Sequence, residues 1–194
     1  MAHARPAVIV RDAREEDLPA VHTILTHYIL TSHAIFIDEP QPFDETRAKY
    51  ASVRAAGMPY LVATLPDPSP DGPARERVVG YTYVSPYHPR PGYRLTLENT
   101  IYLAPDHAGM GIGGALLSAL IAACERGPWR TIIASIGDAG GGWTNRASIG
   151  LHEKFGFRHV GRMGKLGVKL GRWVDVVYMQ LDIGEPKGEE EDSV

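Results

Sequence analysis

Glycines alternate along residues 109–114, and a strongly helix-forming segment, residues 115–123, follows them directly. Such a turn exposes backbone N–H groups at a helix N-terminus, where the helix dipole also favours negative charge. The pattern therefore predicts a binding site for a phosphate or a pyrophosphate. The loop residues that we expect to form this site are Gly109, Met110, Gly111, Ile112, Gly113 and Gly114.

A dinucleotide-binding fingerprint is an alternative for this loop, because Gly109, Gly111 and Gly114 have its spacing. In that fingerprint the glycines follow a strand almost directly. Here residues 104–108 separate them from the expected strand, and the loop lies in the middle of the chain rather than in an opening βαβ unit. We therefore favour another phosphorylated cofactor, and a purely structural tight turn remains the other alternative.

Glu98 is the second residue that could do chemistry. It lies in a strand expected over residues 93–103, among leucine and isoleucine residues, where an unpaired carboxylate is costly. Because side chains alternate along a strand, Glu98 points to the face opposite Leu97. It is either a functional carboxylate or one half of a structural salt bridge.

Spacing argues against several other kinds of active site. His152 and Glu153 begin a zinc-protease motif, but Gly156 stands where its second histidine belongs, and the other histidines show no ligand spacing. Ser135 lacks the first glycine of a nucleophile elbow. We expect no metal cofactor.

The composition is typical of one compact domain. The chain has 194 residues, of which 44% are hydrophobic and 22% charged, so it can bury a sizeable core. It shows no apolar run of membrane-spanning length, no signal peptide and no clustered basic face for nucleic acid. A single cysteine, Cys124, indicates a reducing compartment, and we expect a cytoplasmic protein in which Cys124 is a core residue.

The expected elements alternate between strands and helices and predict a mixed α/β fold with a central sheet. The globular domain is expected over residues 7–182 and a disordered acidic tail over residues 183–194, where five acidic residues face one lysine. Strands are expected at residues 8–11, 60–64, 78–84, 93–103, 131–136, 157–163 and 172–181. Helices are expected at about residues 15–30, 43–56 and 145–154 and directly after the glycine loop.

Three features in collinear order carry a resemblance to a known family: the strand with Glu98, the glycine loop, and the later motif Asn145-x-x-Ser148-x-x-Leu151-His152-x-x-Phe155-Gly156-Phe157. The chain resembles the GNAT superfamily of acetyl-CoA-dependent N-acetyltransferases and, more narrowly, the phosphinothricin (methionine sulfoximine) acetyltransferases. The similarity spans roughly residues 7–182. It implies a single domain with a mixed, mostly antiparallel sheet flanked by helices, and it leaves a homodimer possible.

The resemblance assigns acetyl-CoA as the cosubstrate, with its pyrophosphate on the glycine loop. It implies that backbone groups of Ile101, Tyr102 and Leu103 hold the pantetheine arm and polarise the thioester carbonyl, and that Asn145 and Ser148 also contact the cofactor. For Asn145 a helix N-cap is the simpler alternative. The chain departs from the family at residue 108, an alanine where an arginine or glutamine usually begins the loop.

The resemblance also implies catalytic roles. Glu98 would remove the proton of the acceptor amine, directly or through water. His152 occupies the position from which many members of the superfamily protonate the departing thiolate, although a buried structural histidine explains it equally well.

The substrate residues implied by the resemblance are Arg90, Phe36 and Glu39. An arginine suits an acceptor that carries a carboxylate, because its planar fork can bind both oxygens. Near the C-terminus, Lys169, Trp173 and Asp175 either line the pocket or build a hairpin, and we favour the hairpin.

The sequence therefore predicts an N-acetyltransferase that acetylates a small amino acid such as phosphinothricin or methionine sulfoximine by direct transfer. Two alternatives stay open. One is an enzyme of the same fold that acetylates another amine, such as a polyamine or a protein N-terminus. The other is a module that binds acetyl-CoA without catalysis.

Overall fold

A seven-stranded sheet forms the centre of the computed structural model, which describes residues 8–67 and 75–184. The strand order is β1-β2-β3-β4-β5-β7-β6, and only β4 and β5 are parallel neighbours. This arrangement confirms the expected mixed, mostly antiparallel sheet. The strands are β1 (Ile9–Asp12), β2 (Tyr60–Asp67), β3 (Arg75–Pro86), β4 (Thr96–Leu103), β5 (Thr131–Asp138), β6 (Arg158–Lys169) and β7 (Arg172–Asp182).

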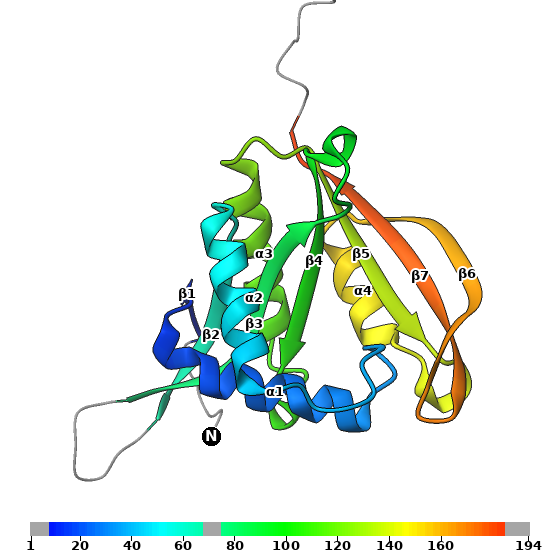
Figure 1. Ribbon diagram of the computed structural model, residues 1–194, viewed down its shortest axis with the longest axis horizontal. Coiled ribbons are helices and arrows are strands. Elements are labelled where there is room, and N and C mark those ends of the chain that lie inside the picture. Colours follow the sequence, from blue (N-terminus) through cyan, green and yellow to red (C-terminus); the bar gives the residue numbers. More distant parts are fainter. Residues whose placement is uncertain (1–7, 68–74, 185–194) are drawn as a thin grey trace, which may run out of the picture.

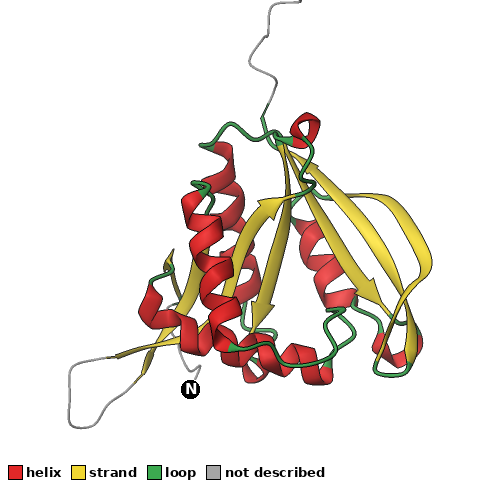
Figure 2. Ribbon diagram, in the orientation of Figure 1, coloured by secondary structure: helices red, strands yellow, loops and turns green. Residues whose placement is uncertain are grey.

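Helices cover both faces of this sheet (Figure 2). Neighbouring residues of β4 identify the two faces, because side chains alternate along a strand. The ring of Tyr102 lies 4.6 Å from that of Tyr28 in α1, whereas Asn99 reaches His152 in α4 on the opposite face. The four α-helices are α1 (Leu18–Thr31), α2 (Phe43–Ala55), α3 (Ile112–Glu125) and α4 (Arg146–Lys154).

The sheet opens between β4 and β5. These strands pair only from Thr96–Glu98 to Thr131–Ile133. Beyond Glu98 they separate, and α4 is visible between them (Figure 1). Because β5 continues to pair with β7 as far as Asp138, the opening leaves the edge of β4 free after Glu98 without disrupting the rest of the sheet.

Helix α3 anchors the core beneath the glycine loop. Its apolar residues recur at helical spacing and are fully buried, and they pack into one hydrophobic cluster with the sheet: Ile112, Leu116, Leu117, Leu120 and Cys124. Burial raises the pKa of the Cys124 thiol to about 12, so Cys124 is a small core residue, as predicted.

Several strand boundaries differ from the sequence-based expectation, and two of these differences bear on the site. The strand expected from residue 93 begins at Thr96, because Pro91–Tyr93 forms a 3-10 turn closed by the Arg94 N–H to the Pro91 carbonyl. The strand expected over residues 157–163 continues to Lys169 through a bulge between Met163 and Gly167, where Lys165 has a φ of 51°.

Parts of two predicted segments lie outside the described residues. The Pro-, Asp- and Gly-rich residues 66–75 predict a hairpin turn, of which residues 68–74 lie outside. The acidic tail predicted from residue 183 lies outside from residue 185 onwards. Among the helices at residues 8–67 and 75–184, none is long and apolar enough to cross a membrane.

Candidate active site

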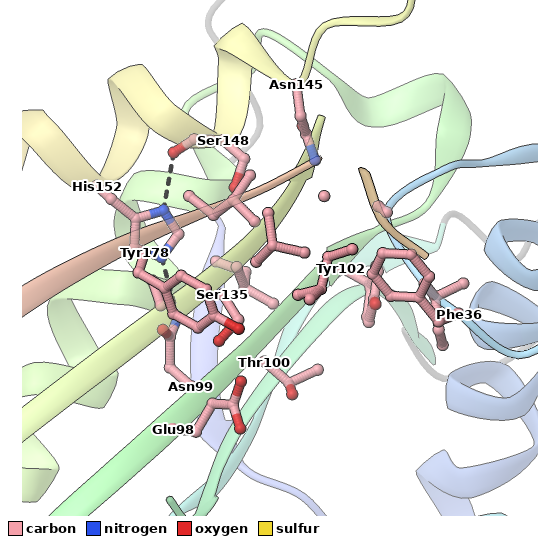
Figure 3. A pocket seen from close by; sticks show the side chains of 18 residues that line it. Phe36, Glu98, Asn99, Thr100, Tyr102, Ser135, Asn145, Ser148, His152 and Tyr178 are labelled. Atoms are coloured by element: carbon pink, nitrogen blue, oxygen red, sulfur yellow. Dashed lines mark hydrogen bonds between the residues drawn. The ribbon is translucent and has the colours of Figure 1, made fainter. Parts of the chain in front are cut away.

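A cavity of about 370 Å³, called here the central cavity, occupies the opening between β4 and β5 (Figure 3). Because consecutive residues of β4 line it, the cavity reaches through the sheet from one face to the other. Its lining includes Phe36, Glu98, Asn99, Thr100, Ile101, Tyr102, Ser135, Asn145, Ser148, Leu166, Tyr178 and His152. Residues predicted separately from three segments of the chain therefore meet here.

Glu98 is half-buried, and its carboxylate points into the central cavity (Figure 3). Within the described part of the chain no hydrogen bond or ion pair is found for this carboxylate, so a structural salt bridge does not account for it. Burial raises the pKa of Tyr83 and of Tyr178, and the negative charge of Glu98 raises both further. Glu98 is thus available to a ligand that carries a proton or a positive charge.

His152 is buried and bonded at both ring nitrogens. Its Nδ1 lies 2.8 Å from the Ser148 carbonyl oxygen, which can only accept, so Nδ1 carries the proton. Its Nε2 lies 3.0 Å from Nδ2 of Asn99 and accepts a hydrogen bond from that amide. Burial lowers the pKa of His152, and this effect outweighs that of the hydrogen bond to Ser148, which raises the pKa. A neutral ring with no free N–H favours the structural alternative for this residue.

This assignment predicts a pH-dependent stability. At neutral pH His152 is neutral in the folded and the unfolded chain. As the pH falls below the ordinary histidine pKa of about 6.5, the unfolded chain binds a proton that folded His152 excludes. Its contribution to the free energy of unfolding should therefore decline, by at most about 1.4 kcal/mol per pH unit.

Denaturant unfolding of the parent and of His152→Gln between about pH 7.5 and about pH 5.5 measures this contribution. The difference between the two proteins should shrink as the pH falls. A difference that stays constant over this range would show that His152 does not remain neutral in the folded chain.

The glycine loop has the conformation that a phosphate site needs. Gly109 and Gly111 have φ values of 75° and 84°, a region that favours glycine, and an added Cβ at either position would meet nothing within 4 Å. Gly111 is the N-cap of α3, and no side chain caps the helix there. The first N–H groups of α3 are therefore open to an anion.

A groove of about 220 Å³, called here the helix groove, leads from this loop towards the central cavity. It runs between the β4 end, α3 and α4, and is lined by Tyr28, Ile101, Tyr102, Leu103, Ala108, Gly113, Asn145 and Ser148, among others. Strand β5 pairs with no residue of β4 beyond Glu98. The backbone of residues 101–103 therefore forms an unpaired strand edge on the side towards β5. The groove and the loop together fit a long phosphorylated arm.

Asn145 lies where the helix groove meets the central cavity. It is the N-cap of α4 by position, but its side chain makes no capping hydrogen bond. The simpler alternative for Asn145, a capping side chain, is therefore not realised, and its amide points towards the cavity (Figure 3).

The loop between α1 and α2 is tied to the β6–β7 hairpin across the site. The buried Lys169 donates a hydrogen bond to the Ile37 carbonyl and lies 3.6 Å from a carboxylate oxygen of Asp38. Phe36 packs against Gly167 so closely that a Cβ there would lie 2.5 Å from its ring. Lys169 thus stabilises the hairpin and links it to the loop between α1 and α2. This is the structural interpretation that we favoured from the sequence.

Asp175 and Trp173 also belong to the hairpin. Asp175 accepts hydrogen bonds from Arg162 and from the backbone N–H of Lys165, and so holds the bulge of β6. Trp173 is exposed. The same bulge carries Leu166 to the central cavity, and Leu166 and Tyr178 are lining residues that the sequence analysis missed.

Two of the three predicted substrate residues lie apart from the cavities. Phe36 lines the central cavity, but Glu39 and Arg90 line neither the central cavity nor the helix groove. Arg90 is exposed at the start of the turn formed by Pro91–Tyr93. The Pro91-Gly92 pair that follows Arg90 is a turn signal, and the turn replaces the expected start of the strand.

Comparisons with known proteins agree with this geometry. The model of the acetyltransferase (GNAT) family matches residues 34–157. The chain is 46% identical to a phosphinothricin N-acetyltransferase from Alcaligenes faecalis, covering 91% of this chain and 83% of that protein. It is 33% identical to an L-methionine sulfoximine/L-methionine sulfone acetyltransferase from Pseudomonas aeruginosa, covering 90% and 94%.

Among solved structures, a phosphinothricin acetyltransferase from Sinorhizobium meliloti in complex with acetyl-CoA superimposes with a TM-score of 0.82. It is 36% identical to this chain, and the match covers 91% of this chain and 89% of that one.

Proposed function

Because the chain belongs to the acetyltransferase (GNAT) family, we propose that it acetylates the amine of a small, glutamate-like amino acid. Phosphinothricin and methionine sulfoximine are the leading acceptors, since relatives at 46% and 33% identity are named for these compounds. N-acetyltransferase activity follows from the family itself. The observation that carries the proposal is the carboxylate of Glu98, which has no partner among the described residues and points into a cavity that reaches through the sheet.

We assign the glycine loop, the helix groove and the adjoining edge of β4 to acetyl-CoA, which supplies the acetyl thioester. Backbone N–H groups of residues 109–114 hold the pyrophosphate. Backbone groups of residues 101–103 bind the pantetheine arm and polarise the thioester carbonyl. Asn145 and Ser148 hold the arm where it enters the central cavity. Ala108 contributes no side-chain bond to the pyrophosphate, so the loop relies on its backbone.

Glu98 is assigned as the general base. An ammonium ion has no free electron pair with which to attack a carbonyl, so the acceptor must lose a proton first. Glu98 accepts that proton, directly or through water, on the face of the sheet that carries α1 and α2. Phe36 shapes the acceptor side of the cavity, and Glu39 and Arg90 stay predictions from the resemblance. We assign His152 as a positioning residue, which holds Asn99 beside Glu98 on β4.

The test of the reaction is product analysis with the purified protein, acetyl-CoA and phosphinothricin. We expect thiol release matched by a product that carries one acetyl group on its α-amine. The intact mass of the enzyme incubated with acetyl-CoA alone should show no bound acetyl group, as direct transfer requires. An acetylated enzyme that passes its acetyl group to the acceptor would contradict direct transfer.

We further propose that the chain forms a homodimer through the β6–β7 hairpin. Strand β6 is an edge of the sheet, and the hairpin exposes large apolar side chains that normally have a partner: Val160, Met163, Leu166, Val168, Leu170 and Trp173. Val168 and Trp173 are direct cross-strand partners and are 52% and 59% exposed. A cytoplasmic location stays a prediction that the single cysteine supports.

Val168→Glu should convert the dimer into a monomer, because the substitution would bury an unpaired charge at the proposed interface. Sedimentation velocity of the parent, Val168→Glu and the control Val168→Thr measures this. We expect a dimer for the parent and the control. A monomeric parent protein at assay concentrations would contradict the proposal.

A further inference from the structure

A second cavity, of about 380 Å³, lies on the face of the sheet that carries α1 and α2. Four tyrosines from three neighbouring strands line it, and we call it the tyrosine cavity. Its lining residues are Val21, Leu25, Ile35, Ile37, Gln41, Glu45, Thr46, Lys49, Tyr60, Tyr81, Tyr83, Glu98, Thr100 and Tyr102. None of the roles assigned above to the acetyl donor uses it.

The tyrosine cavity meets the central cavity at the proposed base. Ile35, Glu98, Thr100 and Tyr102 line both. An acceptor whose amine lies at Glu98 can therefore present this amine to the thioester in the central cavity. The rest of the acceptor then extends beneath α1 and α2. The acetyl donor reaches the same point through the helix groove, which shares Tyr102 with the tyrosine cavity among their described lining residues, so the two ligands approach Glu98 by different routes.

Lys49 distinguishes this cavity chemically. Among the described residues that line the central cavity, the tyrosine cavity and the helix groove, it is the one lysine or arginine. Its Nζ lies 5.9 Å from the centroid of the Tyr83 ring. No ion pair of Lys49 is found in the described part of the chain, whereas two other cations of α2, Arg47 and Arg54, pair with Asp44 and Asp12.

The charges around the tyrosine cavity suit a zwitterion. Glu98, at its junction with the central cavity, attracts an ammonium group. Lys49, on α2, attracts an anion. Glu45 lies one helical turn before Lys49 and also lines the cavity, so it offers a carboxylate to the second ammonium group of a polyamine. Whether the cavity binds an amino acid or a polyamine therefore depends on which of the two side chains, Lys49 or Glu45, contacts the ligand.

We infer that the tyrosine cavity holds the anionic end of the acceptor and that Lys49 binds its oxygens, while the amine lies at Glu98. This assignment rests on the proposed function and specifies the acceptor as an amino acid rather than a polyamine. A carboxylate and a phosphinate present the same anionic oxygen chemistry to an ammonium group, and hydrogen bonds of this charged kind are the strong ones. Lys49 takes the specificity role that the resemblance gives to Arg90.

Kinetics of a graded series at residue 49 test this inference, with phosphinothricin, methionine sulfoximine and the carboxamide of methionine sulfoximine as acceptors. Lys49→Met should raise the KM for phosphinothricin at least about 10-fold with kcat and the KM for acetyl-CoA nearly unchanged. Lys49→Glu should raise it further, and Lys49→Arg should restore most of the affinity. Arg47→Met is the matched control, because it removes an equal charge from the same helix away from the cavity.

The three acceptors distinguish whether Lys49 binds the carboxylate or the phosphinate group. If Lys49 binds the carboxylate, Lys49→Met should leave the KM for the carboxamide unchanged. If Lys49 binds the phosphinate, the variant should affect phosphinothricin much more than methionine sulfoximine. An unchanged KM for all three acceptors would overturn the inference, as would the finding that Arg90→Ala, and not Lys49→Met, removes the preference for anionic acceptors. Absence of turnover by the parent with every acceptor would instead refute the proposed function.

Discussion

Replacement of Glu98 by glutamine should lower kcat about 100- to 1,000-fold at neutral pH, which lies within the usual range for loss of a general base. Glutamine keeps the size and a hydrogen-bonding oxygen of the side chain but cannot accept the proton of the ammonium group. The KM for acetyl-CoA should stay unchanged, because the cofactor's predicted contacts lie on the glycine loop and along residues 101–103. Steady-state kinetics at saturating acceptor measure both quantities.

The pH dependence separates this chemical role from a structural one. Without the base, the reaction depends on acceptor that is already neutral, so the relative loss should diminish as the pH rises towards the pKa of the amine. Glu125→Gln, at the exposed end of α3, is the control and should behave as the parent. Unchanged turnover of Glu98→Gln, or an equal loss at every pH, would remove Glu98 as the base.

Replacement of Gly111 by valine should raise the Kd for acetyl-CoA by about 10- to 100-fold. At a φ of 84°, a residue with a Cβ is strained by roughly 1–2 kcal/mol, and a branched side chain is less tolerant still. The added atoms would also enter the open space that the pyrophosphate needs. Isothermal titration calorimetry with acetyl-CoA measures the change.

The control for this prediction is Gly114→Ala, within the first turn of the same helix. A Cβ at residue 114 would lie 3.7 Å from the Phe155 ring, an ordinary contact, and would leave the backbone N–H in place. Its Kd should stay close to that of the parent. If Gly111→Val binds acetyl-CoA normally, the pyrophosphate does not lie on this loop.

Local patterns explain which parts of the site could be predicted. The glycine loop was predictable because positive φ angles favour glycine. The helix-forming segment that follows it, residues 115–123, is also visible in the local sequence. Glu98 was predictable because a carboxylate stands out in an apolar strand. The mixed, mostly antiparallel sheet follows from the resemblance, and the structure confirms it. The strand order and the opening between β4 and β5 were not predicted.

Other features depend on contacts between distant segments. The tyrosine cavity takes its lining from two helices, three strands and the loop between α1 and α2, so Lys49 looks like an ordinary surface lysine in the sequence. Leu166 reaches the central cavity because a bulge in β6 is held by Asp175, which lies ten residues after Lys165. Arg90 looked well placed because it precedes the strand of Glu98, but a short turn keeps it on the surface.

The most direct test of the central claim is the rate of thiol release from acetyl-CoA by the purified protein over a panel of amines. The panel contains phosphinothricin, methionine sulfoximine, common amino acids, polyamines and a peptide with a free N-terminus. The structure and the comparisons lead us to expect the highest kcat/KM for the two glutamate-like acceptors. A preference for polyamines or for the peptide, or acetyl-CoA binding without turnover of any amine, would contradict the proposed function.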